Sequence, residues 1–230
     1  MRLVIKLSGE SLRGDPEHYD QETLAAIVSH IRTLHSHGHQ VALVVGGGNL
    51  FRGAQLIKEL SIERGTADYI GMLATVQNAL VLRDYFETQG LVTRVSSAIA
   101  MPQICEGYMP KRAIRHMDKG RVVIFASGLG APYFTTDSTA VQRALEIHAD
   151  MLIMAKNGVE GVYTSDPKKD SSAKLLPELT ASESLEKGLR FADQASIALA
   201  KEHGLPIRVV SIDHIAEAPK GKVGTHIIPK

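Results

Sequence analysis

The stretch VALVVGGGNLFRG, residues 41–53, joins five apolar residues to three consecutive glycines and an arginine. The apolar run is typical of a buried strand. Glycines at its carboxyl end allow backbone N–H groups to approach an anion without an obstructing side chain. A tight turn from the strand into a helix would explain the same glycines. The stretch therefore predicts a strand followed by a loop, and leaves open whether that loop binds phosphate.

Short runs rich in Val, Ile and Leu recur along the chain, and most are separated by helical sequence. This alternation is typical of an α/β protein with a mainly parallel sheet and helices on both faces. Asp20 and Thr66 are predicted to cap the first two helices. The predicted strands are 2–7, 40–45, 90–95, 121–126, 150–155 and 206–211, and the predicted helices are 20–37, 66–89, 136–149 and 191–203.

No internal repeat or linker divides the chain, so we predict a single domain over residues 1–230. Residues 164–189, TSDPKKDSSAKLLPELTASESLEKGL, form one long polar excursion. Polar segments of this length inside a compact domain are usually functional. We therefore predict a flap at 164–189.

Charge and cysteine content exclude several classes of protein. The 26 Lys and Arg residues nearly balance the 25 Asp and Glu residues, so there is no basic field to bind a nucleic acid or an anionic membrane. Cys105 is the single cysteine, which excludes an internal disulfide and a thiolate metal cage. The amino terminus has no signal-peptide pattern, and no apolar run is long enough to span a bilayer. We expect a soluble, cytoplasmic protein.

Two other predicted strands end in similar sequence. The first strand runs into KLSGE, residues 6–10, and the strand at 121–126 runs into SGLGAPYFTTDS, residues 127–138. Ligands of open α/β sheets bind outside the carboxyl ends of the strands. The three loops are therefore predicted to converge on one crevice.

Each polar residue in these loops also has an ordinary structural explanation. Lys6 could be a surface lysine whose amine reaches solvent at the strand end. Asp137 could stabilise a helix N-terminus rather than bind a lysine or a metal ion. Arg52 could be a helix-surface charge, or it could fold back onto a phosphate held at the glycines. The residues alone leave these alternatives open.

Two familiar phosphate-binding motifs do not fit the chain. The P-loop requires G-x-x-x-x-G-K-[ST], and no Lys-Ser or Lys-Thr follows the glycines. The dinucleotide fingerprint requires G-x-G-x-x-G on the first turn, where this chain has LSGESLRG, residues 7–14. A phosphate site here would therefore belong to another class.

Five segments together resemble the bacterial uridylate (UMP) kinases of the amino acid kinase superfamily. They are KLSGE at 6–10, GGGNLFRG at 46–53, ADYIGMLATVQN at 67–78, APYFTTDS at 131–138 and KNGVEGVYTSDP at 156–167. The resemblance implies a three-layer α/β/α sandwich that phosphorylates UMP to UDP with ATP and Mg²⁺, in pyrimidine nucleotide biosynthesis. It further implies a homohexamer, with activation by GTP and inhibition by UTP.

The resemblance also implies roles for individual residues. Catalysis would fall to Lys6, Asp137, Arg52 and Lys156, with Lys6 offsetting charge on the moving phosphoryl group and Asp137 orienting the lysines. The residues implied on the ATP side are Lys6, Leu7, Ser8, Gly9, Gly48, Arg52, Asn157, Tyr163 and Asp166. Those implied on the UMP side are Gly47, Asp68, Leu129, Gly130, Ala131, Pro132, Tyr133, Phe134, Thr135 and Thr136. No protein ligand to a metal is implied, since the triphosphate would hold the Mg²⁺.

The chain departs from the family pattern in two places. Residues 129–132 read Leu-Gly-Ala-Pro where Thr-Gly-Asn-Pro is common, which removes a hydroxyl and an amide near the expected UMP. Residues 13–20, RGDPEHYD, replace a glycine-rich run that is linked to GTP activation in the family.

Two other functions fit parts of the pattern. A related kinase acting on a carboxylate or carbamate would share the fold and the ATP side, but Asp68 with GMLATV resembles the uridylate branch. A nucleotide-binding regulator on the same scaffold would not need Lys6 or Asp137, and both are present. The sequence therefore favours an ATP:UMP phosphotransferase.

Overall fold

The computed structural model describes residues 1–13, 19–51 and 53–230. Across these residues nine strands form one sheet in the order β4-β3-β5-β2-β1-β6-β8-β9-β7. Within that sheet, β8 and β9 are antiparallel and the other neighbours are parallel, which confirms the predicted sheet. The strands are β1 (Arg2–Leu7), β2 (Gln40–Val45), β3 (Thr93–Ser97), β4 (Glu106–Gly107), β5 (Val122–Ala126), β6 (Met151–Lys156), β7 (Glu178–Thr180), β8 (Ile207–Ser211) and β9 (Thr225–Ile228).

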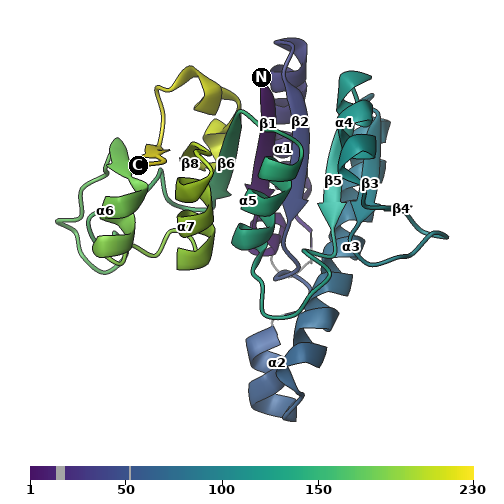
Figure 1. The fold of residues 1–230 in the computed structure, drawn as a ribbon, viewed down its shortest axis with the longest axis horizontal. Helices are drawn as coiled ribbons and strands as arrows, with labels where there is room; N and C mark the ends of the chain where they lie inside the picture. Colours follow the sequence, from purple (N-terminus) through teal and green to yellow (C-terminus); the bar gives the residue numbers. More distant parts are fainter. Residues whose placement is uncertain (14–18, 52) are drawn as a thin grey trace.

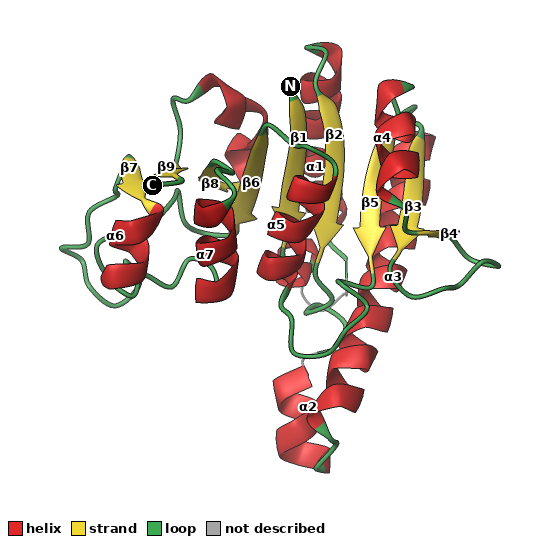
Figure 2. Cartoon of the chain, in the orientation of Figure 1, coloured by secondary structure: helices red, strands yellow, loops and turns green. Residues whose placement is uncertain are grey.

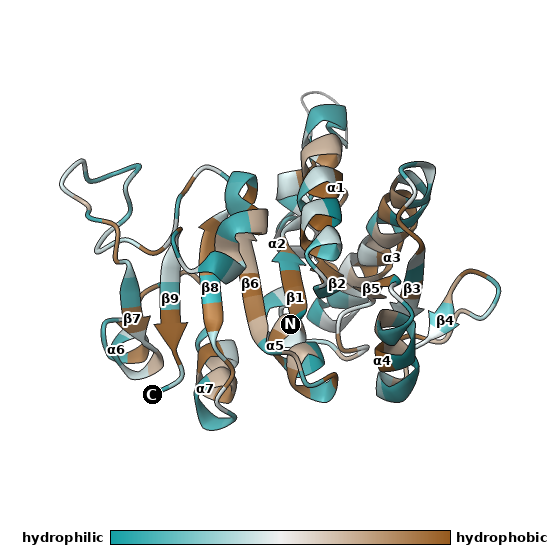
Figure 3. Ribbon diagram, turned by 90° about the horizontal axis from the view of Figure 1, so that it is seen from above, coloured by the Kyte–Doolittle hydropathy of each residue, from teal (hydrophilic) through white to brown (hydrophobic). Residues whose placement is uncertain are grey.

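Helices cover both faces of the sheet and make the three-layer α/β/α sandwich that the resemblance implies. Figure 3 shows α1 and α3 on one side of the row of strands and α4, α5, α6 and α7 on the other. The helices are α1 (Gln21–Ser36), α2 (Gly53–Leu60), α3 (Arg64–Thr88), α4 (Pro110–Asp118), α5 (Thr136–Glu146), α6 (Ala181–Glu186) and α7 (Gln194–Glu202), with 3-10 helices η1 (Gly9–Leu12) and η2 (Ile212–Lys220).

The two faces of the sheet bury separate hydrophobic cores. In β1, Leu3, Ile5 and Leu7 pack into the core under α1 and α3, whereas Val4 packs into the core under α5 and α7. Successive side chains of a strand point to opposite faces. Lys6, two residues after Val4, is therefore on the α5 face.

Short elements account for most of the differences from the prediction. The strands β4, β7 and β9 have two to four residues, too few for a visible alternation. The helices α2, α4 and α6, of six to nine residues, were also not predicted. Asp20 caps α1 as predicted. The prediction that Thr66 caps α3 is wrong, because Glu63 accepts from the N–H groups of Gly65 and Thr66 and starts the helix earlier.

The predicted flap at 164–189 has regular structure in its second half. Residues 178–180 form β7, which pairs with β9. Thr180 and Glu183 form a reciprocal capping box that starts α6 directly after β7. An irregular loop is therefore confined to the residues before β7, where Tyr163 and Leu175 form an isolated bridge.

Figures 1 and 2 show α2 and the first turns of α3 projecting beyond the sheet. They extend from the end at which β1, β2 and β5 terminate. None of the helices in the described ranges combines the length and the apolar character needed to cross a bilayer.

Candidate active site

The triple glycine turns sharply at the end of β2, against the end of β1. The N–H of Gly46 donates to the carbonyl of Leu7 at 2.9 Å. A Cβ on Gly9 would collide with the backbone N of Gly48, and a Cβ on Gly47 would lie 2.8 Å from Cβ of Ala74. Glycine is required here because three backbone segments pass too closely for side chains.

Two asparagines fix this turn in place. Asn78 of α3 donates to the carbonyl of Gly46 at 2.6 Å and to Oδ1 of Asn49 at 2.7 Å. Tyr19 donates to Oδ1 of Asn78 at 2.9 Å. Both asparagines lie inside segments that carried the resemblance, but no local pattern indicated that they pair. They hold the glycine turn against α3.

A cavity of about 260 Å³ opens between the glycine turn, α3 and the start of α5. Six residues predicted to bind a nucleotide line it, including Gly48, which the resemblance placed on the ATP side. The sequence did not single out several others, among them Phe51, Met72, Thr75 and Thr139. The six are Gly47, Gly48, Asp68, Phe134, Thr135 and Thr136. We call this the acceptor cavity.

Asp68 fastens the loop after β5 to α3. Its Oδ2 accepts from the N–H of Tyr133 at 2.8 Å, and both of its oxygens accept from Nε of Arg64 at 2.9–3.0 Å. The guanidinium of Arg64 also lies 5.4 Å from the ring centroid of Tyr133. Asp68 therefore borders the acceptor cavity and anchors its covering loop.

Residues 129–132 of that loop do not line the acceptor cavity. Gly130 has a left-handed φ of +75°, and its N–H donates to the carbonyl of Ser127. Tyr133 is also left-handed and is 67% exposed. The segment that departs from the family pattern thus bends around the cavity, while Phe134, Thr135 and Thr136 face it.

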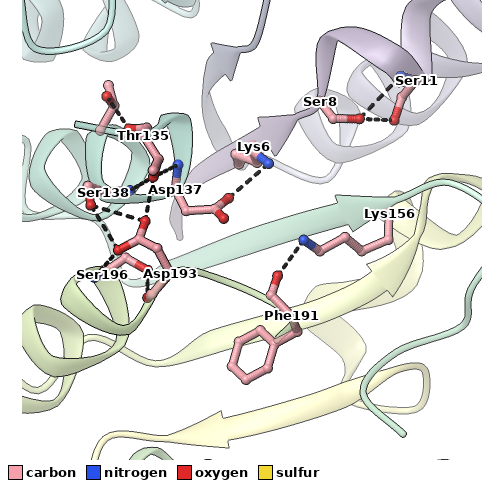
Figure 4. Close-up of polar contacts among 11 residues, drawn as sticks. Lys6, Ser8, Ser11, Thr135, Asp137, Ser138, Lys156, Phe191, Asp193 and Ser196 are labelled. Atoms are coloured by element: carbon pink, nitrogen blue, oxygen red, sulfur yellow. Dashed lines mark hydrogen bonds and ion pairs between the residues drawn. The ribbon is translucent and has the colours of Figure 1, made fainter. Parts of the chain in front are cut away.

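Lys6 of β1 and Asp137 of α5 form an ion pair. The Lys6 Nζ lies 2.8 Å from Oδ1 of Asp137, and both side chains are largely buried. Asp137 is in the first turn of α5, directly above the strand face that bears Lys6 (Figure 4). A snorkelling surface lysine is therefore excluded, and Asp137 binds a lysine as well as starting a helix.

Lys156 ends β6 on the same face as Lys6. Lys6 is in register with Met154 of the neighbouring strand, and Lys156 follows two residues later. Its Nζ donates to the carbonyl of Phe191 at 2.5 Å. Burial, followed by the positive charge of Lys6, lowers the pKa of Lys156, and Asp137 opposes this. The buried Lys6, the partly buried Lys156 and one carboxylate therefore meet at this end of the sheet.

Asp193, which the sequence did not single out, connects α5 to α7. Its carboxylate accepts from the hydroxyls of Thr135 and Ser138 on both sides of Asp137. It also caps α7 by accepting from the N–H of Ser196 at 2.8 Å (Figure 4). A helix-capping aspartate was the available signal, but its second set of contacts depends on the tertiary fold.

Two further cavities lie beside Lys156. One, of about 470 Å³, is bordered by Ser8, Asn157 and Lys156. The other, of about 580 Å³, is bordered by Tyr163, Asp166 and again Lys156. We call these together the donor cavities. Four residues predicted on the ATP side, Ser8, Asn157, Tyr163 and Asp166, thus divide between two cavities that share Lys156, whereas Gly48 lines the acceptor cavity.

The other predicted site residues are placed as follows. The side chain of Leu7 is fully buried in the core, so only its backbone faces the strand end. The Oγ of Ser8 accepts from the N–H of Ser11 and caps η1. Arg52 lies outside the described residues, as does most of the altered 13–20 segment.

Comparison with known proteins identifies relatives of the whole chain. The model of the amino acid kinase family matches residues 1–211. Uridylate kinase of Tropheryma whipplei (strain Twist) is 52% identical over 227 residues, which cover 98% of this chain and 97% of the relative. Uridylate kinase of Mycobacterium tuberculosis (strain ATCC 25618 / H37Rv) is 47% identical over 228 residues, with 97% and 87% covered.

Solved structures agree with these relatives. UMP kinase from Bacillus anthracis superposes with a TM-score of 0.96 at 37% identity, covering all of this chain and 96% of the other. UMP kinase from Ureaplasma parvum gives a TM-score of 0.92 at 34% identity, with 99% and 98% covered.

Proposed function

This chain belongs to the amino acid kinase family, and from its similarity to uridylate kinases of that family we infer that it is one. It transfers the γ-phosphoryl group of ATP to UMP, giving UDP and ADP. The observation that supports this most strongly is the 52% identity to a uridylate kinase over nearly the full length of both chains. The acceptor cavity at the glycine turn and the donor cavities beside Lys156 suit two nucleotides that meet at their phosphates.

The chemistry requires positioning and charge neutralisation. The nucleophile is a phosphate oxygen of UMP that is already ionised at neutral pH, so no general base is needed. Catalysis of phosphoryl transfer then depends on in-line alignment and on cations beside the transferred group. We propose Lys6 and Lys156 as these cations, supported by their position on one face of neighbouring strands and by the ion pair that holds Lys6 against Asp137.

We propose that Mg²⁺ arrives with ATP, held by the phosphate oxygens. This arrangement requires no carboxylate cage in the protein. The described residues contain no group of three His, Cys, Asp or Glu side chains that could hold a metal ion. The protein would thus bind the magnesium complex of ATP as its substrate.

The two alternative functions are less well supported. A carboxylate or carbamate kinase would not need an acceptor cavity bordered by Asp68 and by Phe134 and Thr135. A regulator without activity would not need a buried lysine paired with a carboxylate, which is costly to maintain without a use.

A coupled assay of ADP release tests the function directly. The purified protein should turn over rapidly with UMP, slowly with CMP, and at background rate with aspartate, glutamate or carbamate. Turnover with a small carboxylate that exceeds turnover with UMP would overturn the assignment.

Asp68 provides a prediction about the ribose. Two carboxylate oxygens suit the vicinal hydroxyls of a ribose, so Asp68→Ala should raise the KM for UMP about tenfold. The preference for UMP over 2′-deoxy-UMP should narrow. Initial rates with both nucleotides at saturating ATP measure this.

Controls separate recognition of the ribose from anchoring of the loop. Arg64→Ala removes the Nε–H that both oxygens of Asp68 share but keeps the carboxylate, so the ribose preference should persist. Asp84→Ala removes an exposed carboxylate elsewhere on α3 and should change neither constant. If Asp68→Ala raises the KM for UMP and the KM for 2′-deoxy-UMP by the same factor, Asp68 serves only to anchor the loop.

We further propose a homohexamer in the cytoplasm, activated by GTP and inhibited by UTP, acting in pyrimidine nucleotide biosynthesis. In support of assembly, α3 exposes Tyr69 by 44% and Leu73 by 47% on its projecting half. Apolar surface of this kind is often covered by another subunit. Light scattering at micromolar concentration measures the assembly.

A further inference from the structure

Arg143 lies almost fully buried in α5, where a guanidinium needs partners. Its Nη1 donates to Oε2 of Glu146 at 2.6 Å, and its Nη2 donates to the carbonyl of Gly128 at 3.1 Å. Its guanidinium carbon lies 3.7 Å from the ring centroid of Tyr108. One side chain thus joins α5, the segment after β4 and the loop after β5.

The partners of Arg143 are themselves held firmly. The hydroxyl of Tyr108 donates to Oε2 of Glu146, and Gln142 donates to Oε1 at 2.9 Å. Burial raises the pKa of Tyr108, so its hydroxyl stays protonated and remains a donor. Its ring packs edge-on against Phe125 of β5, with the centroids 5.5 Å apart. The cluster is therefore a rigid mount for the guanidinium.

Gly128 occupies the corner where the chain leaves β5 for the acceptor cavity. Ser127 and Gly128 have consecutive left-handed φ values of +61° and +56°, and a serine there is strained. The N–H of Ser127 donates to Oγ1 of Thr75 at 2.8 Å, and its hydroxyl bonds to that of Ser97. From the opposite face of the sheet, Arg143 donates to the carbonyl of the next residue, Gly128. Gly128 itself lines the acceptor cavity.

We propose that Arg143 is a positioning residue for the acceptor nucleotide. It holds the carbonyl of Gly128, and thereby sets the path of the loop from 127 to 135, of which Gly128, Phe134 and Thr135 line the acceptor cavity. The guanidinium is planar: its N–H groups donate to Glu146 and to the carbonyl of Gly128, and its flat face lies against the Tyr108 ring. A lysine ammonium at this position cannot reach Glu146, Gly128 and the Tyr108 ring together. The proposal rests on the assignment of that cavity to UMP.

Arg143→Lys tests the proposal, because it keeps the charge and removes the fork. The KM for UMP should rise about tenfold, whereas the KM for ATP should stay within about twofold of wild type. The fold-change in kcat should be smaller than the fold-change in the KM for UMP. Arg115→Lys is the matched control: it makes the same substitution at an exposed arginine of α4, outside the cluster around Arg143, so both constants should be unchanged.

Equal changes in both KM values, or an unchanged KM for UMP in folded Arg143→Lys, would overturn the proposal. If that variant does not fold, Glu146→Gln replaces it, because the amide weakens the hold on Arg143 at nearly constant shape. In Glu146→Gln the KM for UMP should rise about threefold, and the KM for ATP should not rise with it. An unchanged KM for UMP in this variant would also overturn the proposal. Failure of the proposed function is distinguishable, since wild-type protein would then not phosphorylate UMP.

Discussion

Lys6→Met and Asp137→Asn should each lower kcat about 10²-fold or more while UMP still binds. The Lys6 ammonium offsets charge that is greatest in the transition state, and Asp137 holds that ammonium at 2.8 Å. Neither group lines the acceptor cavity, so the KM for UMP should change little. Steady-state kinetics with saturating ATP measure both constants.

Folding must be separated from catalysis in this test, because each single change leaves a buried charge without its partner. Breaking a buried pair costs about 3 kcal/mol of folding free energy. The double variant Lys6→Met with Asp137→Asn removes both charges, so its melting temperature should recover toward that of wild type. Its turnover should remain low. Lys201→Ala, an exposed lysine of α7, is the control for general effects. If the double variant recovered activity together with stability, the ion pair would be structural.

Much of the fold was predictable because it depends on local patterns. Runs such as 40–45 and 122–126 are buried on both faces, and their apolar character marks a central parallel strand. Edge elements escaped prediction because their conformation depends on neighbours: β7 exists through pairing with β9. The start of α3 was also misplaced, because Glu63, a residue type not usual as a cap, accepts from the N–H groups of Gly65 and Thr66.

Site residues could be predicted where they belong to a short sequence motif. Contacts between residues far apart in the sequence could not be predicted. Lys6 and Asp137 followed from their motifs, and strand alternation then accounts for the face on which they meet. Asp193 is an ordinary helix cap, and Arg143 lies in ordinary helical sequence. Their contacts with Thr135 and Gly128 depend on how α5 and α7 pack, which no local pattern specifies.

Lys156→Met should abolish most activity and yet leave the protein as stable as wild type or more stable. Lys156 is partly buried beside Lys6, and its amine is held by a backbone carbonyl rather than by a carboxylate. Methionine has a similar length and carries no charge. We expect kcat to fall about 10²-fold, because one of two cations beside the transferred phosphoryl group is lost. Steady-state kinetics and thermal unfolding at pH 7 measure the two effects.

The stability gain follows from the direction of the pKa shift. Because burial lowers the pKa of Lys156, the folded protein binds this proton less tightly than the unfolded chain does. The charge therefore opposes folding at neutral pH, and this cost disappears as the pH rises from the folded pKa toward the ordinary lysine value. The difference in melting temperature between Lys156→Met and wild type should shrink over that alkaline range. In the same range wild-type kcat should fall, because the catalytic ammonium loses its proton. A methionine variant that is less stable at pH 7, or that keeps its turnover, would show that Lys156 supports the fold rather than the reaction.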